Sequence, residues 1–328
     1  MPGASLQPRR SARGPICLTS HGIVISRSES AIERARIRFE REHCLMLRGF
    51  LSPEFLELIQ RVLAGLKFRP NVHAGFGRDL APTSNNAAGA MVLMLNDPDL
   101  FRAIEAITGC GRLRILTGSV RRAVAGGKAL SWHDDTGEHR RVAITINLSA
   151  KAYRGGLLQI RERSSGRIVE EIANTGPGDA ILFRVSPALE HRNTEIVGAV
   201  PKTAFSGWFQ SRAATNQANP NQAGPVRTKR RVSKRTAVTA NTQVIVAPAT
   251  VTRRDGEETI LLNLVSGEVY RLNQSGAQIY ALLKRTTTPG RVARKIAAEY
   301  GIDPDLVARD CIPLLADLAD RDLIEIGV

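Results

Sequence analysis

The sequence predicts a mainly β domain with flanking helices, followed by a small α+β domain. Three observations predict this fold class. Apolar residues recur with a helical period over residues 29–66, and from about residue 112 they alternate with polar ones in short runs bounded by Gly, Pro or Ser. A polar stretch, residues 211–243, then precedes a second patterned region, residues 244–328. Helices followed by many short strands favour a barrel or jelly roll backed by helices.

The composition narrows the class of protein. The chain has 328 residues, of which 43% are hydrophobic and 23% charged, which suffices for two domains with sizeable cores. No apolar run approaches the roughly 20 residues of a membrane helix, so we expect no membrane partner. The four cysteines lie far apart without CxxC spacing, which argues against a zinc site or a disulfide framework and predicts a cytoplasmic protein. Residues 1–28 are basic near their start and lack a continuous apolar segment, so they are expected to form a flexible tail.

The formal net charge of +15 attracts nucleic acid, anionic membranes or acidic peptides, and it also aids solubility. Residues 211–243 carry part of this charge but almost no large apolar side chains. They cannot bury enough surface to offset the chain entropy of folding, so a flexible basic linker is predicted. Its basic run from Arg227 to Arg235 could bind nucleic acid or an acidic peptide, although such a run is usually a solvated tether.

Local signals place the first elements. Ser52, Pro53 and Glu54 predict a helix start, because they supply a cap, a first-turn proline and an acid at the positive end of the helix. The apolar side chains that then share one helix face are Phe55, Ile59, Val62, Leu63 and Leu66. Residues 142–148 alternate strictly and predict a strand, and further short strands are predicted in LLQIRE, DAILFR and TAFSGWFQ.

Candidate metal ligands lie in the stretch SWHDD, just before the strand at 142–148. On a strand, His133 and Asp135 would project from one face while Asp134 points away. His191, which follows an apolar strand 58 residues later, is the candidate third ligand. Two imidazoles and one carboxylate form a facial triad that selects non-haem Fe(II) and leaves positions open for oxygen chemistry. Trp132, beside the first ligand, is expected to pack in the core.

A cation follows the third ligand. Lys202 begins the predicted strand KTAFSGWF, eleven residues after His191. A fixed ammonium there could hold the far carboxylate of a bidentate 2-oxo acid. Alone, Lys202 would read as an ordinary strand-edge lysine, and a lone HxD is a weak metal signal. Together they raise the expectation of an oxygenase site.

From about residue 38 to 210 the chain resembles the iron(II)/2-oxoglutarate-dependent dioxygenase superfamily. The resemblance is carried by REHCLMLRGFLSPEFLELIQ as first strand and helix, and then by WHDD, YRGGLLQI, GDAILF…LEHR and KTAFSGWF. It implies a double-stranded β-helix (jelly roll, cupin-like) over residues 29–210, with Fe(II) held by His133, Asp135 and His191. It also implies 2-oxoglutarate and O2 as co-substrates, with the 2-oxo acid decarboxylated to succinate. Because halogenating relatives have a small residue at the position of Asp135, hydroxylation is the expected reaction.

The same resemblance predicts the residues that bind 2-oxoglutarate. Many relatives have Arg where Lys202 stands, although the peptide prolyl hydroxylase branch uses Lys. A tyrosine often found on the strand before HxD is absent, and Ser119 and Arg121 stand in that region. Arg121 could help to hold the 2-oxo acid or a substrate carboxylate, or it could face solvent. Lys202, Arg121 and Ser119 are therefore the predicted co-substrate residues.

Residues 244–328 predict three short strands, with turns at Asp255-Gly256 and Ser266-Gly267, followed by three helices. This winged-helix-like α+β module resembles the PqqD-like family of peptide chaperones and recognition elements, through LLNLVSGEVYRLNQSGAQIYALL. The resemblance implies that a leader peptide adds a strand beside the third strand and packs against the last helix. The residues predicted to contact it are Glu268, Val269, Tyr270, Arg271, Leu272 and Arg309.

Together the two modules predict a peptidyl hydroxylase that modifies a ribosomally synthesised precursor peptide. A recognition module on a flexible tether would raise the effective concentration of the core peptide at the iron. One alternative is a nucleic-acid-binding or nucleic-acid-modifying oxygenase that uses the basic winged-helix-like module. The basic linker lacks the interleaved aromatic residues for base stacking, which disfavours nucleic acid as a partner without excluding it. A second alternative is a binding protein whose iron site is vestigial.

Overall fold

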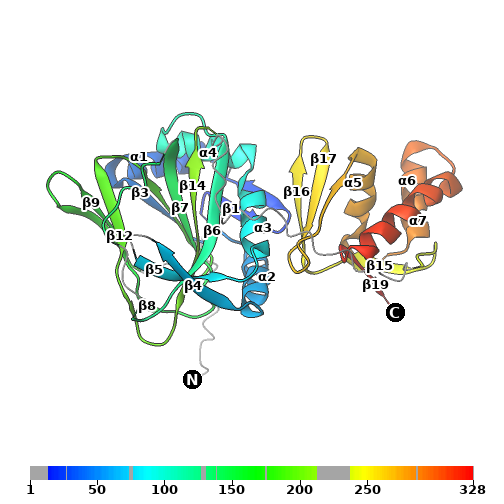
Figure 1. The fold of residues 1–328 in the computed structure, drawn as a ribbon. Coiled ribbons are helices and arrows are strands. Elements are labelled where there is room, and N and C mark those ends of the chain that lie inside the picture. The colour runs from blue at the N-terminus through cyan, green and yellow to red at the C-terminus, as the bar shows by residue number, and fades with distance from the viewer. Residues whose placement is uncertain are drawn as a thin grey trace, which may run out of the picture.

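The computed structural model describes residues 14–26, 28–73, 77–126, 131–137, 139–173, 176–212, 237–285 and 287–327. The N-terminal domain is mainly β, of jelly-roll type, with helices against its large sheet (Figure 1). Its helices are α1 (Glu29–Glu42), α2 (Pro53–Ala64), α3 (Asn86–Leu95) and α4 (Pro98–Thr108). Its strands are β1 (Ile16–Thr19), β2 (Gly22–Ile25), β3 (Cys44–Leu47), β4 (Phe68–His73), β5 (Gly77–Pro82), β6 (Ile115–Ala123), β7 (Arg140–Asn147), β8 (Arg154–Gly155), β9 (Leu158–Glu162), β10 (Ile168–Ile172), β11 (Ala180–Arg184), β12 (Leu189–Asn193), β13 (Ile196–Val197) and β14 (Lys202–Gln210).

Two antiparallel sheets enclose the space where the site lies. The large sheet has the order β3-β11-β7-β14-β6-β5-β4, and the small one the order β10-β9-β12. Along β14, Phe205 and Phe209 are fully buried in the main core against the helices. The intervening side chains face the small sheet, because neighbouring strand residues point to opposite faces. A separate apolar cluster, which includes Ala143, Phe183 and Leu189, connects the two sheets.

The segment predicted as helical over 29–66 is a helix, a strand and a second helix. β3 separates α1 from α2, as the family resemblance had implied, and β3 pairs with β11. The start of α2 is as predicted: the Phe55 backbone N–H donates to the Ser52 hydroxyl at 3.2 Å, and Pro53 occupies the first turn. A cap of this kind contributes about 1 kcal/mol to helix stability.

The prediction that residues 1–28 form a flexible tail is wrong for the second half of this segment. β1 and β2 form a hairpin in which Ile16 and Leu18 are fully buried. The Leu18 backbone N–H donates to the Phe50 carbonyl at 2.6 Å, and the Ser52 N–H donates to the Leu18 carbonyl at 2.8 Å. The apolar residues on either side of this tight turn are too few to suggest a core element on their own, and the core that they join becomes visible only in three dimensions.

The C-terminal domain contains two short sheets and a helical layer. Its strands are β15 (Gln243–Val246), β16 (Thr250–Asp255), β17 (Glu258–Asn263), β18 (Val269–Leu272) and β19 (Ile324–Gly327), and its helices are α5 (Gln274–Ala281), η1 (Leu282–Lys284), α6 (Pro289–Tyr300) and α7 (Pro304–Asp320). β16, β17 and β18 form one sheet in that order, and β15 pairs with β19. The α+β composition is therefore as predicted. No helix in the described ranges is long and apolar enough to cross a membrane.

The predicted linker, residues 211–243, falls largely outside the described residues, as does its whole basic run from Arg227 to Arg235. Its described C-terminal end already belongs to the second domain, because Val238 is buried in that domain's core and β15 begins at Gln243. The structure also places the two domains in contact.

α3 carries that contact. It is apolar around its whole circumference, and its buried residues are Ala87, Ala88, Ala90, Met91, Met94 and Leu95. A helix without a polar face is stable only when it is covered on more than one side. α3 packs on β6 of the large sheet and on β16 of the C-terminal domain, and Val251, Leu262 and Leu264 of that domain join the N-terminal core. The C-terminal domain is thus docked, where the sequence had suggested a freely tethered module.

Two glycines bring β6 and β14 close together beneath the site. Gly118 and Gly207 are directly opposite, and a Cβ on Gly118 would lie 2.7 Å from the Ser206 carbonyl oxygen and overlap the Phe205 ring. We expect Gly118→Ala to lower the free energy of unfolding by about 1–3 kcal/mol, because the crowded core must shift. Gly89→Ala, at an exposed position of α3 with open space around it, should raise the free energy of unfolding by about 0.5–1 kcal/mol. Urea unfolding measures both, and equal shifts would contradict the close approach.

Candidate active site

The two histidines of the predicted triad are partners across a short antiparallel bridge. The His133 N–H donates to the His191 carbonyl at 3.1 Å, and the His191 N–H donates to the His133 carbonyl at 2.8 Å. This pairing attaches the segment SWHDD to β12 and puts the two imidazole centroids 4.3 Å apart. Backbone pairing therefore positions both rings.

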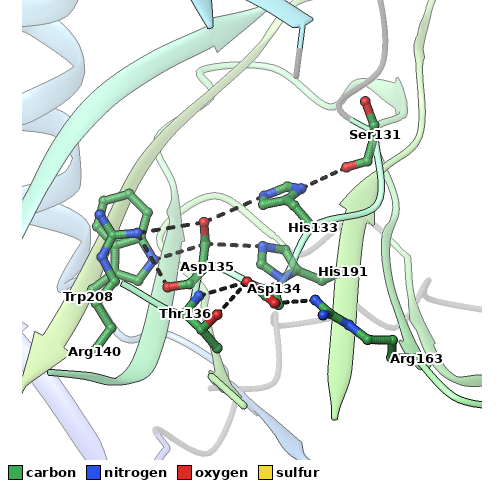
Figure 2. Close-up of polar contacts among 9 residues, drawn as sticks. All are labelled: Ser131, His133, Asp134, Asp135, Thr136, Arg140, Arg163, His191 and Trp208. Atoms are coloured by element: carbon green, nitrogen blue, oxygen red, sulfur yellow. Dashed lines mark hydrogen bonds and ion pairs between the residues drawn. The ribbon is translucent and has the colours of Figure 1, made fainter. Parts of the chain in front are cut away.

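Asp135 reaches the histidines in a way that strand alternation did not predict. Its φ is 52°, in the left-handed region, so a turn rather than a strand aims its carboxylate. Asp135 Oδ2 lies 3.2 Å from His191 Nε2, and Oδ1 lies 3.7 Å from His133 Nε2 (Figure 2). Asp134 points away as predicted: it accepts from the Thr136 N–H at 3.0 Å and pairs with Arg163. The triad assembles, by a different backbone route.

The three side chains fit a single metal ion. One ligand atom of each lies within 4.8 Å of the others, and no second group of this kind occurs in the described part of the chain. The other ring nitrogen of His133, Nδ1, lies 2.7 Å from the Ser131 carbonyl oxygen, which directs Nε2 toward the site. Two imidazoles and one carboxylate on one side of a metal form the donor set of non-haem Fe(II) sites.

Trp208 and Arg140 support the carboxylate from the side opposite the histidines. The Trp208 indole N–H donates to Asp135 Oδ2 at 2.9 Å, and the Arg140 guanidinium stacks 3.9 Å from the indole centroid (Figure 2). Burial alone would raise the pKa of Asp135, but hydrogen bonds from His191 and Trp208 lower that pKa to about 2. The carboxylate is therefore ionised at neutral pH, the form that binds a metal.

We expect Trp208→Phe to lower ferrous affinity about 10–100-fold, because the ring stays but the hydrogen bond to Asp135 is lost. Anaerobic titration calorimetry with Fe(II) measures this. Trp132→Phe is the matched control, since Trp132 packs against the guanidiniums of Arg161 and Arg192 and a phenyl ring can replace it there. Equal effects of the two substitutions would mean that Trp208 acts only through packing.

A cavity of about 880 Å³ opens beside the triad. Its walls come from both sheets, with Thr145 and Ser206 on the large sheet and Glu190 and Asn193 on β12. This volume lies toward the upper end of the range of about 300–1,000 Å³ for ligand pockets. The metal ligands therefore border a space large enough for a small co-substrate together with a substrate side chain.

Family comparisons match both halves of this picture. Residues 119–210 match the 2OG-Fe(II) oxygenase superfamily, and residues 258–324 match coenzyme PQQ synthesis protein D (PqqD). The chain therefore contains a 2OG-Fe(II) oxygenase domain and a PqqD domain. The fusion predicted from sequence is confirmed, and the oxygenase match together with the triad confirms Fe(II), 2-oxoglutarate and O2 as its cofactor and co-substrates.

Solved structures resemble parts of the chain. A prolyl-4-hydroxylase from Pseudomonas putida is 16% identical, with a TM-score of 0.42, over 55% of this chain and 99% of that one. A prolyl hydroxylase from Trichoplax adhaerens, in complex with a hypoxia inducible factor oxygen degradation domain peptide fragment, is 14% identical, with a TM-score of 0.44, over 56% and 90%. TbiB1 in complex with the TbiA(beta) leader peptide is 32% identical, with a TM-score of 0.23, over 25% and 94%. No curated protein matches the chain.

In the oxygenase domain, Lys202 is a partly buried cation in the cavity wall. Its Nζ donates to the Gly156 carbonyl at 2.8 Å and to Asn193 Oδ1 at 2.9 Å, both neutral oxygens. No ion pair to Lys202 occurs within the described residues. Burial lowers the pKa of Lys202 to about 8. A cation in this environment is stabilised when an anionic ligand binds beside it, so Lys202 is suited to bind a carboxylate.

Arg121 and Ser119 lie on the same face of β6, and both line the cavity. The Arg121 side chain is only 21% exposed, so it does not simply face solvent, and its Nε lies 3.8 Å from Asp79 Oδ2. Arg121 thus already has an acidic neighbour, unlike Lys202. All three predicted co-substrate residues line one cavity. Of the two cations among them, Arg121 lies near a carboxylate, whereas Lys202 hydrogen-bonds to neutral oxygens.

The predicted peptide-binding residues of the PqqD domain have different environments. β18 is the edge of its sheet, and Val269 is 45% exposed. Arg271 pairs with Glu258 at 2.9 Å, and Glu268 lies 3.5 Å from Arg321 of the α7 end. Leu272 is buried in the domain core, so only its main chain is available to a ligand. Arg309 is exposed on α7 and, within the described residues, makes no hydrogen bond or ion pair with β18.

Trp208 was not predicted from the sequence as a partner of Asp135, and Trp132 was misplaced. The period of two along β14 offered a signal for Trp208, because residues 202 and 208 share a face. Trp132 is half-buried against two guanidiniums rather than in the core. The contact of Arg140 with Asp135 depends on the turn that follows Asp135.

Proposed function

We propose that this oxygenase hydroxylates a residue of a ribosomally synthesised precursor peptide whose leader binds the PqqD domain. The single observation that carries the proposal is an iron triad beside a large cavity in the same chain as a PqqD domain. His133, Asp135 and His191 would hold Fe(II), which when bound supplies the activation of O2. The overall reaction consumes 2-oxoglutarate, O2 and a C–H bond and yields succinate, CO2 and a C–OH group.

The residues of this chain bind and orient the reactants. Lys202 would hold the far carboxylate of 2-oxoglutarate by charge-assisted hydrogen bonds, while Arg121 and Ser119 would line the same space. Trp208 and Arg140 keep Asp135 ionised and aimed at the metal. The remaining cavity, between β5, β6 and the triad, would admit the substrate side chain.

The free edge of β18 would bind the leader by strand addition. The Asn263 N–H donates to the Glu268 carbonyl, so alternation along the antiparallel pair turns the N–H groups of Val269 and Arg271 away from β17. We expect Arg271→Pro to weaken leader binding at least about tenfold, because it removes one outward donor on an edge strand that tolerates proline. Arg271→Ala is the control for the lost side chain. Anisotropy with a labelled leader peptide measures both, and equal affinities would argue against strand addition.

Turnover of a defined precursor tests the function itself. The substrate would be a synthetic precursor peptide, prepared with and without its leader. With Fe(II), 2-oxoglutarate and O2, we expect succinate release matched by a mass gain of one oxygen on the leader-containing peptide only. Succinate release that no peptide stimulates, or modification independent of the leader, would overturn the proposal.

A further inference from the structure

The three-stranded sheet of the PqqD domain packs on both of its faces. Cross-strand partners share a face, so Leu261, Tyr270 and Leu272 lie on one side, where they pack with the helices of the domain. Val251 and Leu262 are partners on the opposite side and are buried in the core of the oxygenase domain, together with Leu264. This explains why four successive residues of β17, Ile260 to Asn263, are all buried. A strand buried on both faces has a partner on each side.

Polar contacts hold α3 at both ends. Near its N-terminal end, the Asn86 side-chain amide donates to the Val265 carbonyl at 2.9 Å. In the last turn of α3, the Leu93 carbonyl accepts a hydrogen bond from Arg253 Nη1 at 2.7 Å. α3 has no basic residue of its own in that turn, so Arg253 of the PqqD domain supplies the cation that the C-terminal carbonyls of a helix favour. The Arg253 side chain is only 11% exposed, so this contact is shielded from water.

A third contact joins β16 of the PqqD domain to the turn between β1 and β2 of the oxygenase domain. The Thr252 N–H donates to the Ser20 carbonyl at 2.9 Å, and Thr252 Oγ1 lies 3.2 Å from His21 Nδ1. Apolar burial on α3 is therefore flanked by hydrogen bonds at both ends of α3 and at the turn between β1 and β2. β18 is fixed in turn, because it pairs with β17, and β17 pairs with the docked β16.

We infer that the two domains act as one rigid body, and that the enzyme accepts precursors by the spacing between the bound leader segment and the residue to be modified. This inference rests on the proposed function for its substrate. The distance between β18, which would bind the leader, and the iron ligands is then fixed. Each extended residue of the peptide spans at most about 3.3–3.6 Å of that distance. The chain between Arg212 and Ala237 connects the domains but does not set this separation.

A linker series and a spacing series test the inference. We expect trebling the chain length between Arg212 and Ala237 with Gly-Ser residues to leave kcat/KM within twofold. A freely tethered module would instead lose about fivefold, since effective concentration falls as the −3/2 power of tether length. Four Gly-Ser residues inserted between leader and core of the precursor should lower kcat/KM at least tenfold. A linker effect of fivefold, together with tolerance of the peptide insertion, would overturn the inference.

Arg253→Ala and its neighbour Arg254→Ala form a matched pair, because Arg254 is exposed and does not contact α3 through any hydrogen bond or ion pair in the described residues. Arg253→Ala should speed amide hydrogen exchange in α3 at least tenfold and relax the spacing preference, while leader affinity stays within twofold. Arg254→Ala should change neither. If no leader binds, the proposed function fails, yet unequal exchange in the two variants would still establish the docking. Equal exchange would refute it.

Discussion

Asp135→Ala is expected to lower ferrous affinity more than about 100-fold and to abolish succinate release. Removal of a residue that only supports a metal ligand typically costs 10–100-fold, and Asp135 is the single anionic ligand of the triad. Its loss also leaves two neutral imidazoles to bind a dication without a compensating charge. Anaerobic calorimetry with Fe(II) measures the affinity, and a succinate assay measures turnover.

Asp134→Ala is the matched control. The two carboxylates are adjacent in sequence, but Asp134 is satisfied by Thr136 and Arg163 and points out of the triad (Figure 2). We expect Asp134→Ala to keep ferrous affinity within about threefold, the scatter usual for single contacts. Comparable losses in both variants would show that the stretch SWHDD binds metal through its fold as a whole rather than through Asp135.

The ligand residues could be predicted from sequence because their chemistry is rare and their spacing is recognisable. His133, Asp135 and His191 were found from residue type and family pattern, and the structure brings them together. Their backbone geometry was only partly predictable. Alternation along a strand cannot foresee a residue at φ 52°, because that conformation follows from the turn toward β7. The contact of Arg140 with the carboxylate depends on the same turn.

The docking of the domains was hidden for a different physical reason. A polar linker of low apolar content predicts only that the linker does not fold, and it carries no information on whether the domains touch. The information was present elsewhere, in the run NAAGAMVLML of α3, which has no polar face, and in ILLN of β17, which has no exposed face. Each run requires apolar neighbours on two sides. In the structure, the run in α3 and the run in β17 join the same apolar core, so each covers one side of the other.

Lys202→Met is expected to raise the Kd for 2-oxoglutarate at least about 30-fold, the effect of losing 2 kcal/mol from a buried charge-assisted contact. Among the described residues, Lys202 hydrogen-bonds to neutral oxygens only, so its charge is available to a carboxylate. Arg121→Ala should cost much less, because Arg121 already lies beside Asp79. Binding measured by calorimetry under anaerobic conditions separates the two cations. A larger loss with Arg121→Ala would assign the far carboxylate to Arg121 instead.

The pH dependence of this binding follows from the same lysine. Burial lowers the pKa of Lys202 to about 8, so the ammonium that binds the carboxylate is fully present below about pH 7 and is lost as the pH rises through 8. Affinity for 2-oxoglutarate should therefore fall about tenfold per pH unit above 8 in the wild-type enzyme. In Lys202→Met the affinity should be weak and flat over the same range. A flat profile in the wild type would mean that Lys202 keeps its proton through contacts with the co-substrate, or that another cation binds the carboxylate; an unchanged Kd for Lys202→Met decides for the second.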